Sequence, residues 1–302
     1  MSIQTPVLTP KSDAPPWLRR KVSSQSFLMG MQRVAVYAVL IAASVAFLFP
    51  LVWMVSTSLK PKAQVMAMPP RLMPDPIRWQ NYLDALNTPN FEFLLLLKNT
   101  LTYTLLSTLG IMLSCPITAY TFSRLRWPGR DQVFIATLAT MMVPGTVTLI
   151  PTFILFRHLG WTGTLLPLIV PSFFAAPFYI FLLRQFFMSI PVELSEAAVM
   201  DGASHMTILY RVIVPLAKPA LATVALFDFL ACWTDFMGPL IYLADERKFT
   251  LSLGLYAFRE RWEIRYDLMM AAAMLVTLPI LVLFFFTQRT FIEGIALTGI
   301  KG

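Results

Sequence analysis

The stretch that decides the fold is SIPVELSEAAVMDGASHMTILYRVIVPLAKPA, residues 189–220, a polar segment between two strongly apolar parts of the chain. Pro191 is tolerated in the first turn of a helix, where its missing N–H has no partner inside the helix anyway, and Ser189 just before it can serve as N-cap. A short helix should therefore start here and end near Asp201, because Gly202 supplies the backbone freedom for a sharp turn.

A second short helix should follow that turn. Ser204 can cap HMTILYRVIV, which should end before Pro215, since the residue that precedes a proline is pushed out of the helical conformation. Two short helices that meet at Gly202 make a compact elbow, which we expect to lie along one face of the membrane.

The side chains of this elbow favour docking to another protein. Ala197 and Ala198 are small enough to let a second surface approach closely, while Glu196 and Asp201 offer carboxylates to basic groups on it. The alternative is an amphipathic helix that rests on lipid. Because the first helix carries acids and few large apolar residues, the reverse of a basic lipid-binding helix, docking is the preferred interpretation.

The composition places the rest of the chain in a bilayer. Of the 302 residues, 57% are hydrophobic and only 13% are charged, and a soluble domain would need more polar surface. A membrane-spanning helix needs about 20 apolar residues. Runs of this kind predict an all-α polytopic protein with six transmembrane helices at about 34–55, 94–120, 133–156, 165–183, 221–243 and 268–287. The third run is interrupted by Pro144-Gly145 and by Pro151.

Orientation follows from Lys and Arg in the short flanks, which favour the cytoplasmic side. With the N-terminus inside, the cytoplasmic segments contain Lys11, Arg19, Arg20, Lys21, Arg33, Arg124, Arg126, Arg130, Arg184, Arg211, Lys218, Arg289 and Lys301. The outer segments, 60–92 and 245–267, mix both signs, as in DERKF and FRERWEIRYD. We therefore expect both termini and the loop 189–218 in the cytoplasm.

The two ends of the chain read as tails. Residues 1–30 are rich in Pro, Ser, Thr and basic residues without an apolar core, which predicts a flexible cytoplasmic tail and argues against a cleaved signal. The six-helix domain should then occupy 31–288, followed by a cytoplasmic C-terminal tail, 289–302. The glycines from Gly294 to Gly302 suit a segment without regular structure.

Several kinds of chemistry are missing from the sequence. No Gly-x-x-x-x-Gly-Lys-Ser/Thr loop occurs, so the chain does not bind ATP by that route. His158 and His205 belong to no hydrolase or protease motif and read as loop residues. Cys115 and Cys232 lie in apolar runs and read as small buried hydrophobes. The net charge of +8 is spread along the chain, which argues against nucleic-acid binding. No metal ligands and no catalytic constellation stand out.

Two ionisable residues lie at membrane depth. Asp228 and Asp235 are seven residues apart, about two helical turns, and so share one face, which also approaches Trp233 and Thr234. Such a polar stripe could line a translocation path, or it could make helix-to-helix hydrogen bonds inside a bundle. It is also the only support for a stand-alone channel or an ion-coupled secondary carrier.

The polar loop closely resembles a family signature. EAAVMDG, followed by nine residues and VIVP, is similar to the EAA motif of permease subunits of ATP-binding-cassette importers, Glu-Ala-Ala-x-x-x-Gly-x(9)-Ile-x-Leu-Pro. Glu196, Ala197, Ala198, Gly202 and Pro215 match outright. Val replaces Ile and Leu at the two remaining positions.

The resemblance covers most of the chain beyond the N-terminal tail. STSLKP, NYLDAL, NTLTYTLLSTLG, AYTFSRLRWPGR, RQFFMSIPVELSEAA, WTDFMGPL and QRTFIEGIALTGIKG all resemble the carbohydrate branch, the maltose-type permease pairs, and in particular the shorter partner. Many relatives have Trp-Asn-Asp/Glu-Phe where this chain has WTDF. Thr234 therefore replaces an amide.

The resemblance implies a type I importer permease in the bacterial inner membrane, itself not an enzyme, that pairs with a second permease. Two ATPase subunits, which bind ATP and Mg²⁺, would lie beneath it, and a periplasmic or lipid-anchored substrate-binding protein above. Residues 189–218 become the coupling loop, with Ser204 and Asp201 beside the EAA matches and Gly299 in the C-terminal segment as a second ATPase contact. Asn99 and Tyr103 of NTLTYTLLSTLG join the tentative path. The resemblance leaves the carbohydrate open.

Overall fold

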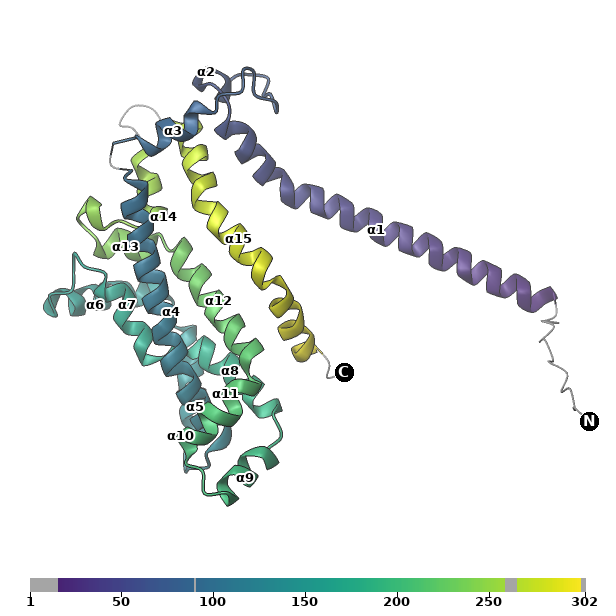
Figure 1. Cartoon of the computed structure of the whole chain (residues 1–302), viewed down its shortest axis with the longest axis vertical. Helices are drawn as coiled ribbons and strands as arrows, with labels where there is room; N and C mark the ends of the chain where they lie inside the picture. Colours follow the sequence, from purple (N-terminus) through teal and green to yellow (C-terminus); the bar gives the residue numbers. More distant parts are fainter. Residues whose placement is uncertain (1–15, 90, 259–264, 300–302) are drawn as a thin grey trace, which may run out of the picture. The chain divides into compact units, whose positions relative to one another are not determined.

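The computed structural model describes residues 16–89, 91–258 and 265–299, and within them the regular structure is entirely helical. The chain divides into two compact units, Met1–Val55 and Ser56–Gly302, which are described one at a time (Figure 1).

The α-helices are α1 (Pro16–Ser58), α2 (Lys62–Val65), α3 (Gln80–Leu86), α4 (Phe93–Arg124), α5 (Arg130–Ala139), α6 (Gly145–His158), α7 (Leu166–Ile169), α8 (Pro177–Ser189), α9 (Glu193–Met200), α10 (His205–Ile208), α11 (Val214–Leu216), α12 (Lys218–Thr234), α13 (Met237–Tyr242), α14 (Leu251–Gly254) and α15 (Tyr266–Gly299). Short helical segments complete the chain: η1 (Thr140–Met142), η2 (Val170–Phe174), η3 (Leu209–Ile213), η4 (Glu246–Lys248) and η5 (Leu255–Phe258).

Over its described residues, the first unit consists of α1 up to Val55. Gly30–Ser58 is long and apolar enough to cross a bilayer. The flexible tail expected over residues 1–30 is wrong for 16–30, which continue the helix. Residues 1–15 lie outside the described part of the chain.

The second unit is built around α4. This helix packs against α8 on one side and α12 on another, and α12 in turn lies beside α15 (Figure 1). The packing is close at Gly110, where an added Cβ would lie only 2.8 Å from Cδ2 of Phe173 and 3.0 Å from the carbonyl carbon of Ser172. Glycine therefore lets α4 and η2 approach closely.

Within the described residues, four helices are long and apolar enough to span a membrane, and six if each of two bent pairs counts as one span. The third expected span is one of the bent pairs: α5–η1 and α6 meet at 96° around Pro144, as the sequence indicated. Pro151, expected to interrupt the same span, instead lies inside α6.

Two boundaries differ from the expectation. The fifth span was placed at 221–243, but α12 ends at Thr234 and α13 begins at Met237 after a break at Asp235. At the other end of the chain, α15 continues to Gly299, so the segment expected from Gly294 to lack regular structure is helical up to Gly299. Hydropathy alone does not mark either boundary, because the apolar composition runs through the break and glycine does not by itself end a helix.

A buried amide makes two of the hydrogen bonds that hold the segment between α1 and α4. Nδ2 of Asn81, in α3, donates to the backbone oxygens of Ser58 at 2.9 Å and Lys60 at 2.8 Å. The Lys60 side chain is also buried, and this burial lowers the pKa of its ammonium group. The NYLDAL stretch thus fixes the chain that leaves α1 before it enters α4.

Candidate functional site

The elbow predicted at Gly202 is present. Helix α9 ends in two reciprocal hydrogen bonds, Gly202 N–H to the Val199 oxygen and Ala203 N–H to the Ala198 oxygen, both 2.9 Å. This pairing is the Schellman motif, which needs a left-handed residue, and Gly202 has φ +80°. Ser204 then accepts the backbone N–H of Thr207 and caps α10, as expected.

Two local predictions around the elbow are wrong. Ser189 does not cap α9: it is the last residue of α8, its hydroxyl donates to the Phe186 oxygen, and α9 begins only at Glu193. The second helix also does not stop before Pro215. A π-helical turn, η3, precedes this proline, and the helix bends by 84° only after Leu216. The wider π turn accommodates a residue that lacks an N–H and crowds the preceding turn.

The elbow presents the predicted docking residues to solvent. Exposed positions are Glu196, Ala197, Asp201, Gly202, Ser204 and Pro215, and Ala198 is half-buried. A Cβ placed on Gly202 would meet nothing within 4 Å in the described structure. The opposite side packs inward, because Ile208 is fully buried in the core that also contains Phe187 and Ile213.

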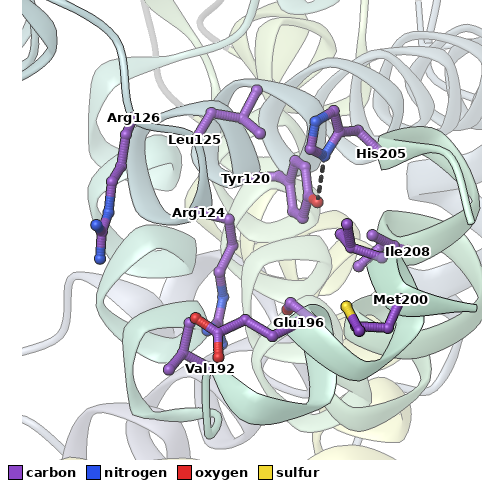
Figure 2. Close-up of a pocket in the computed structure, with 11 residues that line it drawn as sticks. Tyr120, Arg124, Leu125, Arg126, Val192, Glu196, Met200, His205 and Ile208 are labelled. Carbon is purple, nitrogen blue, oxygen red and sulfur yellow. Dashed lines mark hydrogen bonds between the residues drawn. The ribbon is translucent and has the colours of Figure 1, made fainter. Parts of the chain in front are cut away.

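A cleft of about 510 Å³ lies between the elbow and the end of α4. Figure 2 shows Tyr120 and Arg124 of α4 on one side and Glu196 and Met200 of α9 on the other, with His205 above. The Tyr120 hydroxyl lies 3.4 Å from Nδ1 of His205. The side chains of the EAA segment therefore stand next to the α4 terminus, although the two are far apart in the sequence.

Two arginines, one of which lines this cleft, join the C-terminal parts of α4 and α8. Nη2 of Arg124, the last residue of α4, donates to the backbone oxygens of Phe187 and Ile190, each at 2.6 Å. In return, Nε of Arg184 in α8 donates to the Phe122 oxygen at 3.2 Å. From the sequence, Arg124 and Arg184 were predicted only to be positive charges on the cytoplasmic side. Their position at the ends of apolar runs was a signal for helix-terminal carbonyl bonding.

Asp228 makes an interhelical hydrogen bond. It is buried in α12 and accepts the hydroxyl of Thr108 in α4 at 3.0 Å, with Sγ of Cys232 at 3.8 Å. Of the two interpretations of this carboxylate, the structure supports helix-to-helix bonding. Thr108 was not singled out from the sequence, since its role depends on how α4 and α12 pack.

Asp235 lies at the break between α12 and α13. Its Oδ1 accepts the Gly238 N–H at 3.0 Å, which caps α13, and its Oδ2 accepts the Tyr103 hydroxyl at 3.0 Å. The carboxylate is half-buried. The structure thus brings together two of the predicted path residues, Tyr103 and Asp235, at a helix break.

The other predicted path residues make no hydrogen bond to the Asp235 carboxylate among those found in the described structure. Trp233 is buried, stacks on Phe229, and donates its indole N–H to the Val276 oxygen at 3.2 Å, which places it in the core between α12 and α15. Thr234 is exposed and bonds the Leu230 oxygen in its own helix. Asn99 binds backbone oxygens of the segment that follows α13.

The amide of Asn99 makes two hydrogen bonds, to the backbone oxygens of Arg247 at 2.8 Å and Phe249 at 3.0 Å. Both predicted cysteines, Cys115 and Cys232, are buried free thiols. Over the part of the chain that the structure describes, no group of three or more His, Cys, Asp and Glu side chains is arranged to hold a metal ion. Gly299 is the last residue of α15.

Solved structures share this fold. A bacterial ABC transporter involved in the import of the acidic polysaccharide alginate contains a chain with a TM-score of 0.74 and 25% identity, and the match covers 88% of this protein and 97% of that chain. A second structure, of an alginate transporter in complex with its periplasmic protein, has a TM-score of 0.65 at 19% identity and supports the fold alone.

Sequence relatives extend over nearly the whole chain. The arabinooligosaccharide permease of Bacillus subtilis is 30% identical, covering 89% of this chain and 96% of the relative. The trehalose permease of Mycobacterium tuberculosis is 32% identical, covering 91% and 100%. An inner membrane ABC transporter permease of Escherichia coli is 30% identical over 90% and 98%.

The family model described as binding-protein-dependent transport system inner membrane component matches residues 107–295, which include the elbow and both sides of the helix break. With relatives at 30% identity or more over nearly the full length, the resemblance found in the sequence is confirmed. The chain is a multi-pass membrane protein that belongs to the family of binding-protein-dependent transport system inner membrane components, the permeases of ATP-binding-cassette transporters.

Proposed function

We propose that this chain is one of two different permease subunits of an importer for a sugar or oligosaccharide. Relatives named for trehalose and for arabinooligosaccharides suggest the substrate class. The chain would cross the bacterial inner membrane six times with both termini and residues 189–218 in the cytoplasm. Helices α5 and α6 together would form the third span, and α12 would lie in the fifth. A periplasmic or lipid-anchored binding protein would deliver the solute.

The observation that carries the proposal is the exposed elbow. The EAA residues stand at a hydrogen-bonded turn, Glu196, Ala197 and Asp201 are exposed, and a Cβ on Gly202 would meet nothing within 4 Å among the described residues. A surface of this kind suits a close contact with a second protein. We assign that contact to an ATPase subunit, which supplies the ATP and Mg²⁺ site that this sequence lacks. Gly299 is offered as a second contact.

The transport step would be alternating access. Closure of two ATPase subunits on ATP would move the elbow as a rigid body, and the helices attached to it would reorient the cavity between the two permeases. The break at Asp235 is where we place the polar lining of the path, with Tyr103 and Thr234 beside it, because discontinuous helices in transporters expose backbone groups to a solute. Asp228, Trp233 and Asn99 would support this region by packing and hydrogen bonding.

A reconstitution experiment tests the proposal. The complex is purified through a tag on this chain, its polypeptides are identified, and uptake of labelled di- and oligosaccharides into liposomes is compared with uptake by this chain alone. We expect uptake only from the complex, with ATP and the binding protein present. Uptake by the chain alone would support a stand-alone channel or an ion-coupled carrier and would contradict the proposal.

A further inference from the structure

We infer that Arg124 is a positioning residue that makes the elbow and α4 move as one body. The inference rests on the proposed coupling to ATPase subunits and adds the route by which motion leaves the elbow. The two residues whose oxygens it binds, Phe187 and Ile190, bracket the point where α8 ends and the chain turns toward α9.

The geometry makes this turn stiff. Apart from the Arg124 bonds, the Ile190 N–H donates to the Phe187 oxygen at 3.2 Å, and the Val192 oxygen accepts the Ser195 and Glu196 N–H groups at the start of α9. Neither of these contacts ties the linker to α4. The guanidinium adds two charge-assisted bonds to carbonyls at a helix C-terminus, where the last oxygens lack partners in the helix and the dipole favours a cation. A short linker that could flex is therefore tied to α4.

The tie works in both directions. Arg184 in α8 binds the Phe122 oxygen near the end of α4, and its guanidinium lies 4.1 Å from the ring centroid of Phe134 in α5. We call Arg124, Arg184 and the three carbonyls they bind the arginine clasp. Two helices that exchange bonds at their ends resist sliding past each other, which a single contact would not prevent.

Helix α4 then connects the clasp to the helix break. Along its length it carries Thr108, which binds Asp228 of α12, and Tyr103, which binds Asp235 at the break. A displacement of the elbow is thus passed by hydrogen bonds from the clasp to the segment that we assign to the path. A contiguous set of bonded groups is one way to carry coupling over such a distance, and it makes a testable claim about Arg124.

The chemistry of the clasp allows a clean test by substitution. A single nitrogen, Nη2, makes both bonds, while Nε of Arg124 is buried without a hydrogen-bond partner among the described residues. A lysine ammonium has three donors and could make both bonds, whereas methionine keeps an unbranched chain but cannot donate. Arg126, exposed two residues later, offers a matched loss of charge at the same membrane face.

The experiment uses the full complex and two single-cysteine reporters, Met200→Cys on the elbow and Met237→Cys beside the helix break. Both parent side chains are well exposed, whereas the native cysteines are buried and should react slowly. The rate of maleimide modification is measured with and without ATP and vanadate, in the parent and in Arg124→Met, Arg124→Lys and Arg126→Met.

In the parent, in Arg124→Lys and in Arg126→Met, we expect ATP with vanadate to change the maleimide modification rates of both reporter cysteines by about fivefold or more. In Arg124→Met, only the rate at Met200→Cys should change. The inference is overturned if the Met237→Cys rate still responds in Arg124→Met, or if Arg124→Lys fails to transmit. If Arg124→Met does not assemble, Arg124→Gln, with a shorter reach, replaces it under the same criteria. No response at Met200→Cys in the parent would instead contradict the proposed function.

Discussion

The Tyr103 hydroxyl donates to Oδ2 of Asp235 at 3.0 Å, and this bond joins the middle of α4 to the break between α12 and α13. The second oxygen of the same carboxylate caps α13 through the Gly238 N–H. One side chain at the end of α12 therefore binds both the start of α13 and the interior of α4. Its charge and its capping role can be separated by substitution.

Asp235→Asn should preserve the fold and change transport. Asn is as good an N-cap as Asp, so it can still accept the Gly238 N–H, but it removes the negative charge beside the proposed path. Asp235→Ala removes the cap as well and should lower stability by about 1 kcal/mol. Thermal unfolding of the purified complex and sugar uptake measure the two effects. If Asp235→Asn takes up sugar at the same rate as the parent, the charge of this carboxylate has no role in the path.

Gly202→Asp should uncouple ATP hydrolysis from transport while membrane insertion stays intact. Gly202 has φ +80°, a conformation that Asp tolerates better than most residues, and a Cβ there would meet nothing within 4 Å among the described residues. A large loss must then arise from a second surface at the elbow. Gly160→Asp is the matched control, since Gly160 has φ +68° with equally open space but lies after α6. Equal effects of the two variants on the ratio of uptake to hydrolysis would contradict docking at the elbow.

Gly110→Ala should destabilise the packing of α4 against η2. The new Cβ would lie 2.8 Å from Phe173 Cδ2 and 3.0 Å from a backbone carbon of Ser172, and overpacking of this kind costs about 1–3 kcal/mol. Gly145→Ala, where the Cβ meets nothing within 4 Å, is the control. Thermal unfolding in detergent should separate the two variants. A similar midpoint for both would show that the α4–η2 contact relaxes freely.

Asn81→Asp should be more damaging than Asn81→Ala. The Asn81 amide nitrogen donates to two backbone oxygens, and a carboxylate would place negative charge against both in a fully buried site. Alanine leaves the two oxygens without this donor and should cost about 1–3 kcal/mol. Folded yield and thermal stability of the complex measure the order. The reverse order would mean that water or another group replaces the amide.

Short-range signals in the sequence predicted the elbow well and its flanks poorly. Gly202 and Ser204 were read correctly because a left-handed C-terminal residue and a serine N-cap act within a few residues. Ser189 was misread because α8 continues further than its apolar run indicates. Pro215 was misread because a π turn absorbs the proline.

The partners of the membrane-depth residues were beyond sequence reasoning. A period of seven predicted Asp228 and Asp235 on one helical face, but α12 ends at Thr234 and Asp235 lies in the break beyond it. Both carboxylates bind side chains of α4, a partner that depends on packing between distant segments. The same holds for Arg124 and Ile190, which are 66 residues apart. Hydropathy finds apolar helices, yet it does not show which polar groups on them meet.

The most direct test of coupling through the elbow is site-specific photo-crosslinking in the purified complex. A photoreactive residue replaces Met200, which is 88% exposed on α9, or as a control Leu94, which is 78% exposed in the first turn of α4. The account predicts that Met200 crosslinks to a polypeptide that carries a Gly-x-x-x-x-Gly-Lys-Ser/Thr loop, identified by mass spectrometry, and that Leu94 does not. Absence of that product from Met200, in a complex that contains the ATPase, would contradict the account.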